Sequence, residues 1–312
     1  MAERVRRTTL LTVCAVVQAV AVVVMHHVFV TTATGRYVDT VAITGSTIGF
    51  GHIAELVYGV LELVSVASVV IAFVVVVVVA LLRRRAALAL GVGALLVGAN
   101  LTTQVLKQLV FDRPDLPSAL PGGVTGGLFN TLPSGHATVA LSVAVAVVLV
   151  VPARMRGGFA LLAVAYAALT GVGTLSARWH RPSDVIAACL VVGACAAAVG
   201  AFATFRSTRM ASPRRSRALP LLGFAAVVLL AIGVLTLLAT AQTPPDQMHR
   251  LGLFAGYAGG AAAITGTCAA VMAGVLAIAP WVVPEGRAPR RWEPAGDRDA
   301  YGGELATAGW RR

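Results

Sequence analysis

The sequence is poor in charged and in aromatic residues. Asp, Glu, Lys and Arg make up only 12% of the 312 residues and aromatics 6%, whereas 58% are hydrophobic and the mean hydropathy is +0.84. A soluble globular domain carries about 25% charged residues, so this composition excludes one. The scarcity of aromatics and the lack of alternating apolar and polar residues also exclude a transmembrane barrel. We therefore expect an all-α protein that crosses a membrane many times.

Cysteine is also scarce, and its placement excludes a disulfide or zinc framework. All four cysteines fall inside apolar runs, where the residue acts as a small hydrophobic side chain: Cys14, Cys189, Cys195 and Cys268. Acidic residues with the spacing of metal ligands are lacking too, because Asp112 and Asp115 have no His or Glu close by in the sequence. We expect neither a metal site nor a cofactor.

Eight apolar runs follow one another along the chain. A helix needs about 20 mostly apolar residues to cross the hydrocarbon of a bilayer. The first run has 23 residues, which is longer than the core of a secretory signal, and we expect a membrane-spanning helix there. The runs lie near residues 8–30, 53–82, 86–109, 136–152, 158–177, 184–205, 218–240 and 252–283.

The net charge of +12 reflects where the arginines lie relative to a membrane. If the N-terminus is cytoplasmic, 19 of the 25 basic residues fall in cytoplasmic segments, as the positive-inside rule requires. This explains the charge without a nucleic-acid partner. We expect both termini in the cytoplasm and segments 31–52, 110–135 and 178–183 on the extracytoplasmic side. The first of these is rich in Gly and Thr and is expected to be a loop, a candidate lid.

The first of three polar clusters lies at the extracytoplasmic end of the third predicted helix. It contains Lys107, the only lysine of the chain, and Arg113, with five residues between them. A lysine at a helix end commonly extends to the lipid headgroups, so this cluster alone does not indicate a site.

The second cluster, Pro133 to His136, stands directly before a predicted helix. Ser134 is a favoured helix cap, Gly135 lets an anion approach the backbone, and the first-turn N–H groups point at whatever binds there. The pattern fits an anion site, and it fits equally well an ordinary capped helix with an interfacial histidine.

The third cluster contains Arg178, His180, Arg181 and Asp184. The four-residue spacing between His180 and Asp184 lets the carboxylate reach one imidazole nitrogen and leaves the other nitrogen able to attack. An Asp at a helix start also compensates the helix dipole, so both interpretations stay open at this point.

Together and in this order, the clusters resemble the signature of the type 2 phosphatidic acid phosphatase (PAP2) superfamily, which includes lipid phosphatases, bacterial acid phosphatases and haloperoxidases. That signature reads Lys, six residues, Arg-Pro; then Pro-Ser-Gly-His; then Ser-Arg, five residues, His, three residues, Asp. Residues 133–136 match the second part in full, and His180 and Asp184 match the third. The resemblance covers about residues 1–205.

Two positions depart from the family's signature. The spacing between Lys107 and Arg113 is one residue short, and the arginine of the third part would fall at Thr174. Arg178 is the nearest candidate to supply that charge, and Arg181 is another.

The resemblance implies a division of the chain. A six-helix PAP2-like transmembrane core over residues 1–217 would carry the motifs, and two additional transmembrane helices would follow in 218–283. We expect a disordered cytoplasmic tail over residues 284–312, which combine Pro, Gly and mixed charge.

The resemblance also implies a metal-independent phosphatase. His180, oriented by Asp184, would attack phosphorus and form a phosphohistidine, while His136 would protonate the leaving oxygen. The implied substrate is a membrane lipid phosphate or diphosphate: phosphatidate, phosphatidylglycerophosphate or, as we favour, a polyprenyl diphosphate. Its phosphate oxygens would be held by Lys107, Arg113, Arg178, Ser134 and Gly135.

Two other functions stay open on the sequence alone. A lipid transporter or flippase would need broken helices and charged residues near the bilayer midplane. Only Glu55 and Glu62 suggest such residues. A PAP2-like protein that binds lipid without catalysis is compatible with Thr174 in place of the third-part arginine.

Overall fold

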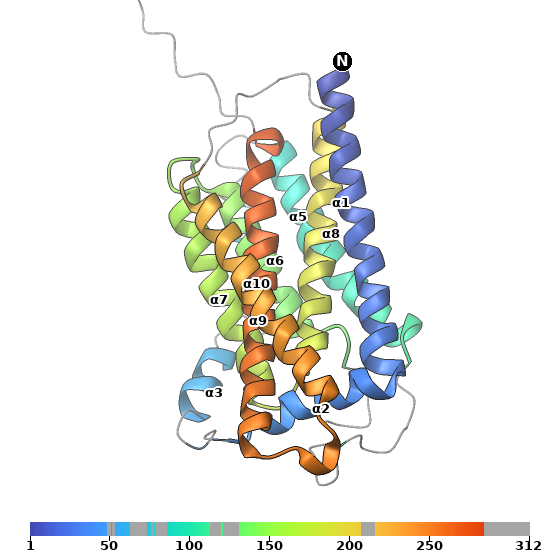
Figure 1. Ribbon diagram of the computed structural model, residues 1–312. Helices are drawn as coiled ribbons and strands as arrows, with labels where there is room; N and C mark the ends of the chain where they lie inside the picture. Colours follow the sequence, from blue (N-terminus) through green and yellow to red (C-terminus); the bar gives the residue numbers. More distant parts are fainter. Residues whose placement is uncertain are drawn as a thin grey trace, which may run out of the picture.

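The computed structural model describes residues 1–48, 51, 54–62, 74–75, 78, 86–112, 120, 131–206 and 216–283. Every regular element within these ranges is a helix, and the long helices pack side by side in one bundle (Figure 1). Two α-helices continue into a π-helical turn. The elements are α1 Ala2–His26 with η1 His27–Thr31, α2 Ala33–Gly45, α3 Ala54–Glu62, α5 Ala86–Val105 with η3 Leu106–Val110, α6 Gly135–Val150, α7 Arg156–Ser176, α8 Pro182–Arg206, α9 Ala218–Gln242, η4 Pro245–Gln247 and α10 Arg250–Val282.

Within the described ranges, six helices are long and apolar enough to cross a membrane: α1, α5, α7, α8, α9 and α10. A further apolar helix, α6, has 16 residues. The predicted all-α, multi-pass membrane fold is therefore confirmed. Most of the span predicted at 53–82 lies outside the described residues, which include α3 there. The predicted tail over 284–312 lies outside them as well.

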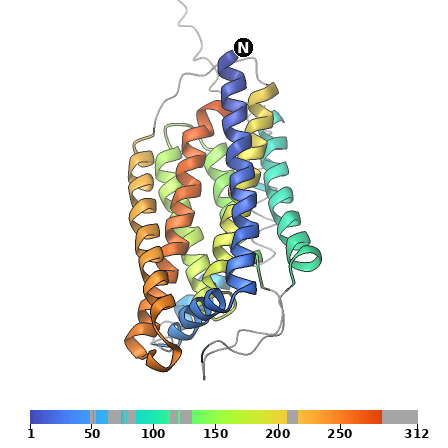
Figure 2. The same ribbon diagram turned by 45° about the vertical axis from the view of Figure 1, so that its right-hand side comes forward.

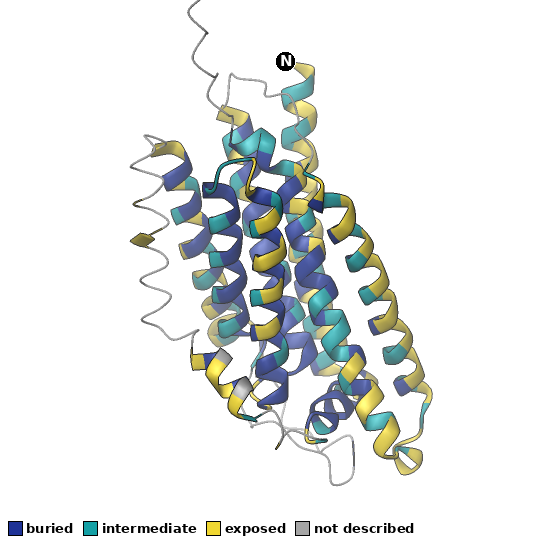
Figure 3. Ribbon diagram, turned by 90° about the vertical axis from the view of Figure 1, so that its left-hand side faces the viewer, coloured by how far each residue is buried: buried dark blue, intermediate teal, exposed yellow. Residues whose placement is uncertain are grey.

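Exposed apolar side chains cover the outward faces of the bundle. Val16 and Val20 of α1 and Val227 and Leu235 of α9 are exposed, although all four are apolar. Buried residues gather instead between the helices, as Figure 3 shows. A soluble monomer rarely leaves so much contiguous apolar surface in water, whereas lipid tails solvate it well.

The long helices alternate in direction, so each connection between them lies at one of the two ends of the bundle. Helices α1 and α8 lie side by side, and Met1 lies at the end opposite α2 and α3 (Figures 1 and 2). The turn between α7 and α8, the start of α6 and the end of α5 lie at the same end as α2. The three polar clusters therefore share one end of the bundle.

The expectation of a loop over residues 31–52 is wrong for most of that segment. Residues 33–45 form α2, a helix that lies across the end of the bundle (Figure 1). Thr32 caps it, since its hydroxyl accepts from the Gly35 N–H at 3.1 Å. Residues 37–43 of α2 are all buried, and the helix packs mainly against α10, with Val38 and Val41 among the buried side chains. Tertiary burial stabilises this short helix more than its Gly- and Thr-rich composition does.

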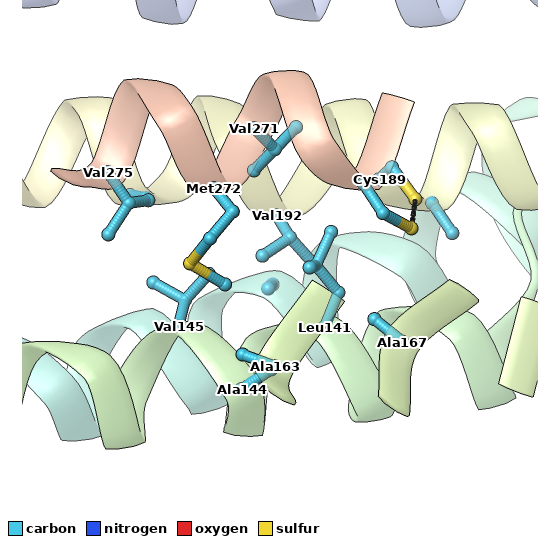
Figure 4. Close-up of a cluster of buried hydrophobic side chains, with 14 of the residues drawn as sticks. Leu141, Ala144, Val145, Ala163, Ala167, Cys189, Val192, Val271, Met272 and Val275 are labelled. Atoms are coloured by element: carbon cyan, nitrogen blue, oxygen red, sulfur yellow. Dashed lines mark hydrogen bonds between the residues drawn. The ribbon is translucent and has the colours of Figure 1, made fainter. Parts of the chain in front are cut away.

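The main core lies between α6, α7, α8 and α10, as Figure 4 shows. It contains Leu141 of α6, Ala163 of α7, Val192 of α8 and Met272 of α10, all buried. On α8 and α10, the sulfur atoms of Cys189 and Cys268 lie 3.6 Å apart as free thiols. These two cysteines pack as small apolar side chains, as predicted.

Small residues let α9 and α10 approach each other closely. A Cβ added at Gly259 of α10 would lie 1.8 Å from the Thr236 hydroxyl oxygen of α9, and one added at Gly266 would lie 2.9 Å from the Leu230 nitrogen. Close approach of backbones is how helices gain packing energy in lipid, where water drives no association. Helix α10 also packs against α7 and α8, so the two additional helices share the core of the preceding ones.

Candidate active site

The turn between α7 and α8 carries the third cluster. Helix α7 ends in a Schellman motif, in which the Trp179 N–H donates to the Thr174 carbonyl at 2.9 Å and the Arg178 N–H to the Leu175 carbonyl at 3.0 Å. Arg178 takes the left-handed position of this motif, with φ of 62°. Glycine is the usual residue there, because a side chain costs about 1 kcal/mol in that conformation. An arginine at a position that favours glycine is a candidate for a functional role.

Asp184 organises the first turn of α8 and faces His180. Its Oδ2 accepts from the Arg181 N–H at 2.9 Å and from the Thr131 hydroxyl at 2.7 Å. The same oxygen lies 3.5 Å from His180 Nδ1, an ion-pair distance that is longer than a good hydrogen bond. Both side chains are buried, His180 at 6% exposure and Asp184 at 0%. The structure thus brings the two side chains together at 3.5 Å, and among the described residues His180 Nδ1 has no hydrogen bond.

The second cluster is hydrogen-bonded directly to the third. Ser134 caps α6, since its hydroxyl accepts from the Ala137 N–H at 3.3 Å. Its own backbone N–H donates to the Asp184 carbonyl at 2.9 Å. The starts of α6 and α8 thus lie side by side, and the first-turn N–H groups of α6 open toward the same polar end.

His136 lies opposite His180 across this end of the bundle. The two ring centroids are 6.3 Å apart, with the ring planes inclined at 61°. The Trp179 ring lies 5.3 Å from the His136 ring and 6.4 Å from the Tyr58 ring of α3. Two imidazoles this close can both contact one phosphate group that binds beside them, as general acid–base and nucleophilic roles on a single substrate require.

The end of α5 brings Lys107 to the same place. Two hydrogen bonds join α5 to α6: the Thr103 and Thr138 hydroxyls lie 2.9 Å apart, and the Asn100 side-chain amide donates to the Ser142 hydroxyl at 3.5 Å. Lys107 lies in the π-helical turn η3, close enough for its charge to act on the His136 ring. Such turns frequently occur at functional sites.

Six of the eight predicted site residues therefore meet at one location, and a seventh adjoins it. Those that meet are Lys107, Ser134, Gly135, His136, His180 and Asp184. Arg178 lies at the left-handed position two residues before His180, and its side chain is exposed. The eighth, Arg113, lies outside the described residues.

The position of the missing third-part arginine is occupied by a packed threonine. Thr174 is fully buried, and its hydroxyl donates to the Gly171 carbonyl at 2.8 Å. Its carbonyl accepts from the His180 N–H at 3.2 Å. This position fixes the backbone of His180 and supplies no cation.

Two side chains at the site, Thr131 and Trp179, were not predicted from the sequence. Thr131 supports Asp184, and nothing in the sequence marks it, because 53 residues separate the two. The Trp179 ring packs against the His136 ring. Because Trp179 stands between Arg178 and His180 in the third cluster, its presence at the site could have been predicted.

No group of three His, Cys, Asp or Glu side chains suited to hold a metal ion occurs among the described residues. The polar groups that meet at the site are instead two imidazoles, one carboxylate, one ammonium and helix N-terminal N–H groups. Such a set suits a phosphate anion.

Comparison with known proteins agrees with the geometry. The family model described as the PAP2 superfamily matches residues 86–209, which run from the start of α5 to just past the end of α8. All the described residues of the three clusters fall within that segment. Neither the search of curated proteins nor that of solved structures returned a match.

Proposed function

We propose that the chain, whose residues 86–209 match the family model described as the PAP2 superfamily, hydrolyses a phosphate or diphosphate ester of a membrane lipid through a phosphohistidine on His180. The family includes phosphatases that act on lipid-like phosphates, which supports the reaction class. One observation carries the proposal: a buried His180–Asp184 pair faces the ring of His136 across the polar end of a membrane-spanning bundle.

Attack by His180 is the first step. In the tautomer that this step requires, Nδ1–H points at Asp184 and Nε2 carries the lone pair. Nε2 forms a bond to phosphorus in line with the ester oxygen, and the phosphorus–oxygen bond breaks. The leaving oxygen takes a proton from His136, which acts as general acid. Asp184 stabilises the positive charge that develops on the His180 ring.

Water completes the cycle. Neutral His136 removes a proton from a water molecule, whose oxygen attacks the phosphorus of the phosphohistidine. The phosphorus–nitrogen bond breaks, orthophosphate leaves, and His180 returns to its starting state. His136 is ready as an acid again, so both residues act once in each half of the reaction.

The phosphate oxygens are held by cations and by helix N-terminal donors. Lys107 reaches the site from α5, the Gly135 N–H opens α6, and the Ser134 hydroxyl retains its proton to donate while it caps Ala137. Arg113 and Arg178 are proposed to complete the set. Neutralising the equatorial oxygens is the main requirement of phosphoryl transfer, so these donors do without a metal ion what magnesium does elsewhere.

The substrate is proposed to arrive laterally from the membrane, with its phosphate at headgroup level. The arginine distribution supports an extracytoplasmic site with both termini in the cytoplasm. We favour a polyprenyl diphosphate over phosphatidate and phosphatidylglycerophosphate. One alternative has a specific observation in its favour: buried Thr174 in place of the family's arginine suits a PAP2-like protein that binds lipid without turning it over.

Turnover by the purified chain tests the proposal. Detergent-purified protein is incubated in the presence of EDTA with one lipid at a time: polyprenyl diphosphate, phosphatidate or lysophosphatidate. Released phosphate is measured for the wild type and for His180→Ala. We expect EDTA-resistant release from at least one lipid and none from the variant. Full turnover by His180→Ala would refute the nucleophile, whereas lipid binding without turnover by the wild type would favour the non-catalytic alternative.

A further inference from the structure

A buried carboxylate outside the family segment contacts the start of α8. Asp39 lies on α2 and is only 2% exposed. Its Oδ1 accepts from the Ser183 backbone N–H at 3.4 Å, and its Oδ2 accepts a short hydrogen bond from the Ser183 hydroxyl. Ser183 is itself 1% exposed, so both partners are shielded from solvent.

These contacts stabilise the turn that carries the proposed nucleophile and its carboxylate. Pro182 begins α8 without an N–H to donate, so Ser183 supplies the first N–H group of the helix. Asp39 satisfies that group from the α2 side. On the other side, Asp184 accepts from the Arg181 N–H at 2.9 Å. Two carboxylates therefore hold the start of α8, Asp39 from α2 and Asp184 from α8 itself, and each also compensates the helix dipole.

The position of this turn sets the geometry of catalysis. His180 precedes α8 by two residues, and its ring faces Asp184 across 3.5 Å. A shift of about 1 Å in a reacting group lowers a rate about 100-fold. On the basis of the proposed function, we propose that Asp39 is a positioning residue: by holding Ser183 it fixes the first turn of α8, so that Asp184 orients His180 for attack.

Helix α2 lies outside residues 86–209, so the contact joins an N-terminal element of this chain to the family segment. Helix α2 is also fixed from its far side, since it packs against α10 and the Tyr37 hydroxyl donates to the Thr243 carbonyl at 2.9 Å. The additional helices support the site through α2 and also directly, since a Cβ added at Gly260 of α10 would lie 2.7 Å from the Pro182 ring at the start of α8. The described contacts place none of their residues against His180.

The test compares Asp39→Ala, Asp39→Asn and a matched control. Asp39→Ala removes both acceptors, so kcat is expected to fall about 10- to 100-fold while KM changes by less than about threefold, because the phosphate-binding donors lie elsewhere. Asp39→Asn retains an oxygen for the Ser183 N–H and offers an amide donor to its hydroxyl, so most of kcat should return. Thr40→Val is the control, since that buried hydroxyl donates to the Arg36 carbonyl within α2.

The outcomes separate this proposal from the proposed function. If wild type releases no phosphate from any lipid, the proposed function has failed. If the wild type is active and His180→Ala is inactive, two results overturn the positioning role and leave the proposed function intact. One is a kcat of Asp39→Ala equal to that of the wild type. The other is a loss of kcat in Thr40→Val as large as that in Asp39→Ala. If size exclusion shows that Asp39→Ala does not fold, Ser183→Ala decides: a loss of kcat of about three- to tenfold at constant KM supports the role, and unchanged kcat overturns it.

Discussion

Replacement of Asp184 by Asn isolates the charge of the carboxylate that faces His180. The carboxamide oxygen can still accept from the Arg181 N–H and the Thr131 hydroxyl, which lie 2.9 and 2.7 Å from Oδ2. The capping of α8 is therefore preserved, and the turn should stay in place. What the substitution removes is the negative charge 3.5 Å from His180 Nδ1.

The expected effect follows from that distance. When Nε2 becomes bonded to phosphorus and Nδ1 keeps its proton, the His180 ring carries a positive charge. At 3.5 Å and an effective dielectric constant of about 20, a full charge pair is worth about 5 kcal/mol. The charge is only partly developed in the transition state, so about 3 to 4 kcal/mol of stabilisation is lost. Asp184→Asn should thus lower kcat about 10²- to 10³-fold.

The assay is phosphate release in detergent under saturating lipid substrate, beside a matched control. Asp246→Asn makes the same chemical change at an exposed acid of η4 and should keep wild-type kcat. Thermal unfolding of both variants should match the wild type. If Asp184→Asn keeps kcat within about threefold while His180→Ala is inactive, the carboxylate does not stabilise the ring and this part of the mechanism is wrong.

Three further substitutions test other parts of the account. His136→Asn should lower kcat about 10²- to 10⁴-fold on an alkyl phosphate but far less on p-nitrophenyl phosphate, whose phenolate leaves without a proton; equal losses would contradict the role of general acid. Arg178→Gly keeps the left-handed turn at φ 62°, so the thermal midpoint should hold or rise while kcat/KM falls about 10-fold or more; unchanged kcat/KM would show that the guanidinium holds no phosphate. Gly259→Ala forces Thr236 aside and should cost about 1 to 3 kcal/mol of stability, whereas Gly274→Ala meets nothing within 4 Å; equal thermal midpoints in detergent would contradict the α9–α10 contact.

The long helices could be predicted from the sequence because bilayer thickness sets the length of an apolar run. The runs expected at 158–177 and 184–205 correspond to α7 at Arg156–Ser176 and α8 at Pro182–Arg206. Helix α2 could not be predicted in this way, since its stability comes from burial of Val38 and Val41 against a helix more than 200 residues later. Such long-range packing cannot be predicted from the local composition of the segment.

The core of the site could be predicted because its residues lie in short motifs with fixed spacing. The four-residue step from His180 to Asp184 spans one helical turn, and the helix start after Ser134 follows from local capping. Supporting residues could not be predicted, because they come from distant segments. Asp39 lies 144 residues before Ser183, and no local rule links the two.

In the proposed mechanism, phosphate passes through a covalent bond to His180. Wild-type protein is stopped with alkali during turnover of a ³²P-labelled lipid phosphate, digested, and its labelled peptide identified by mass spectrometry. We expect acid-labile, alkali-stable phosphate on His180 in the wild type and none in His180→Ala. Steady turnover with no label on His180, or with label on another residue, would contradict it.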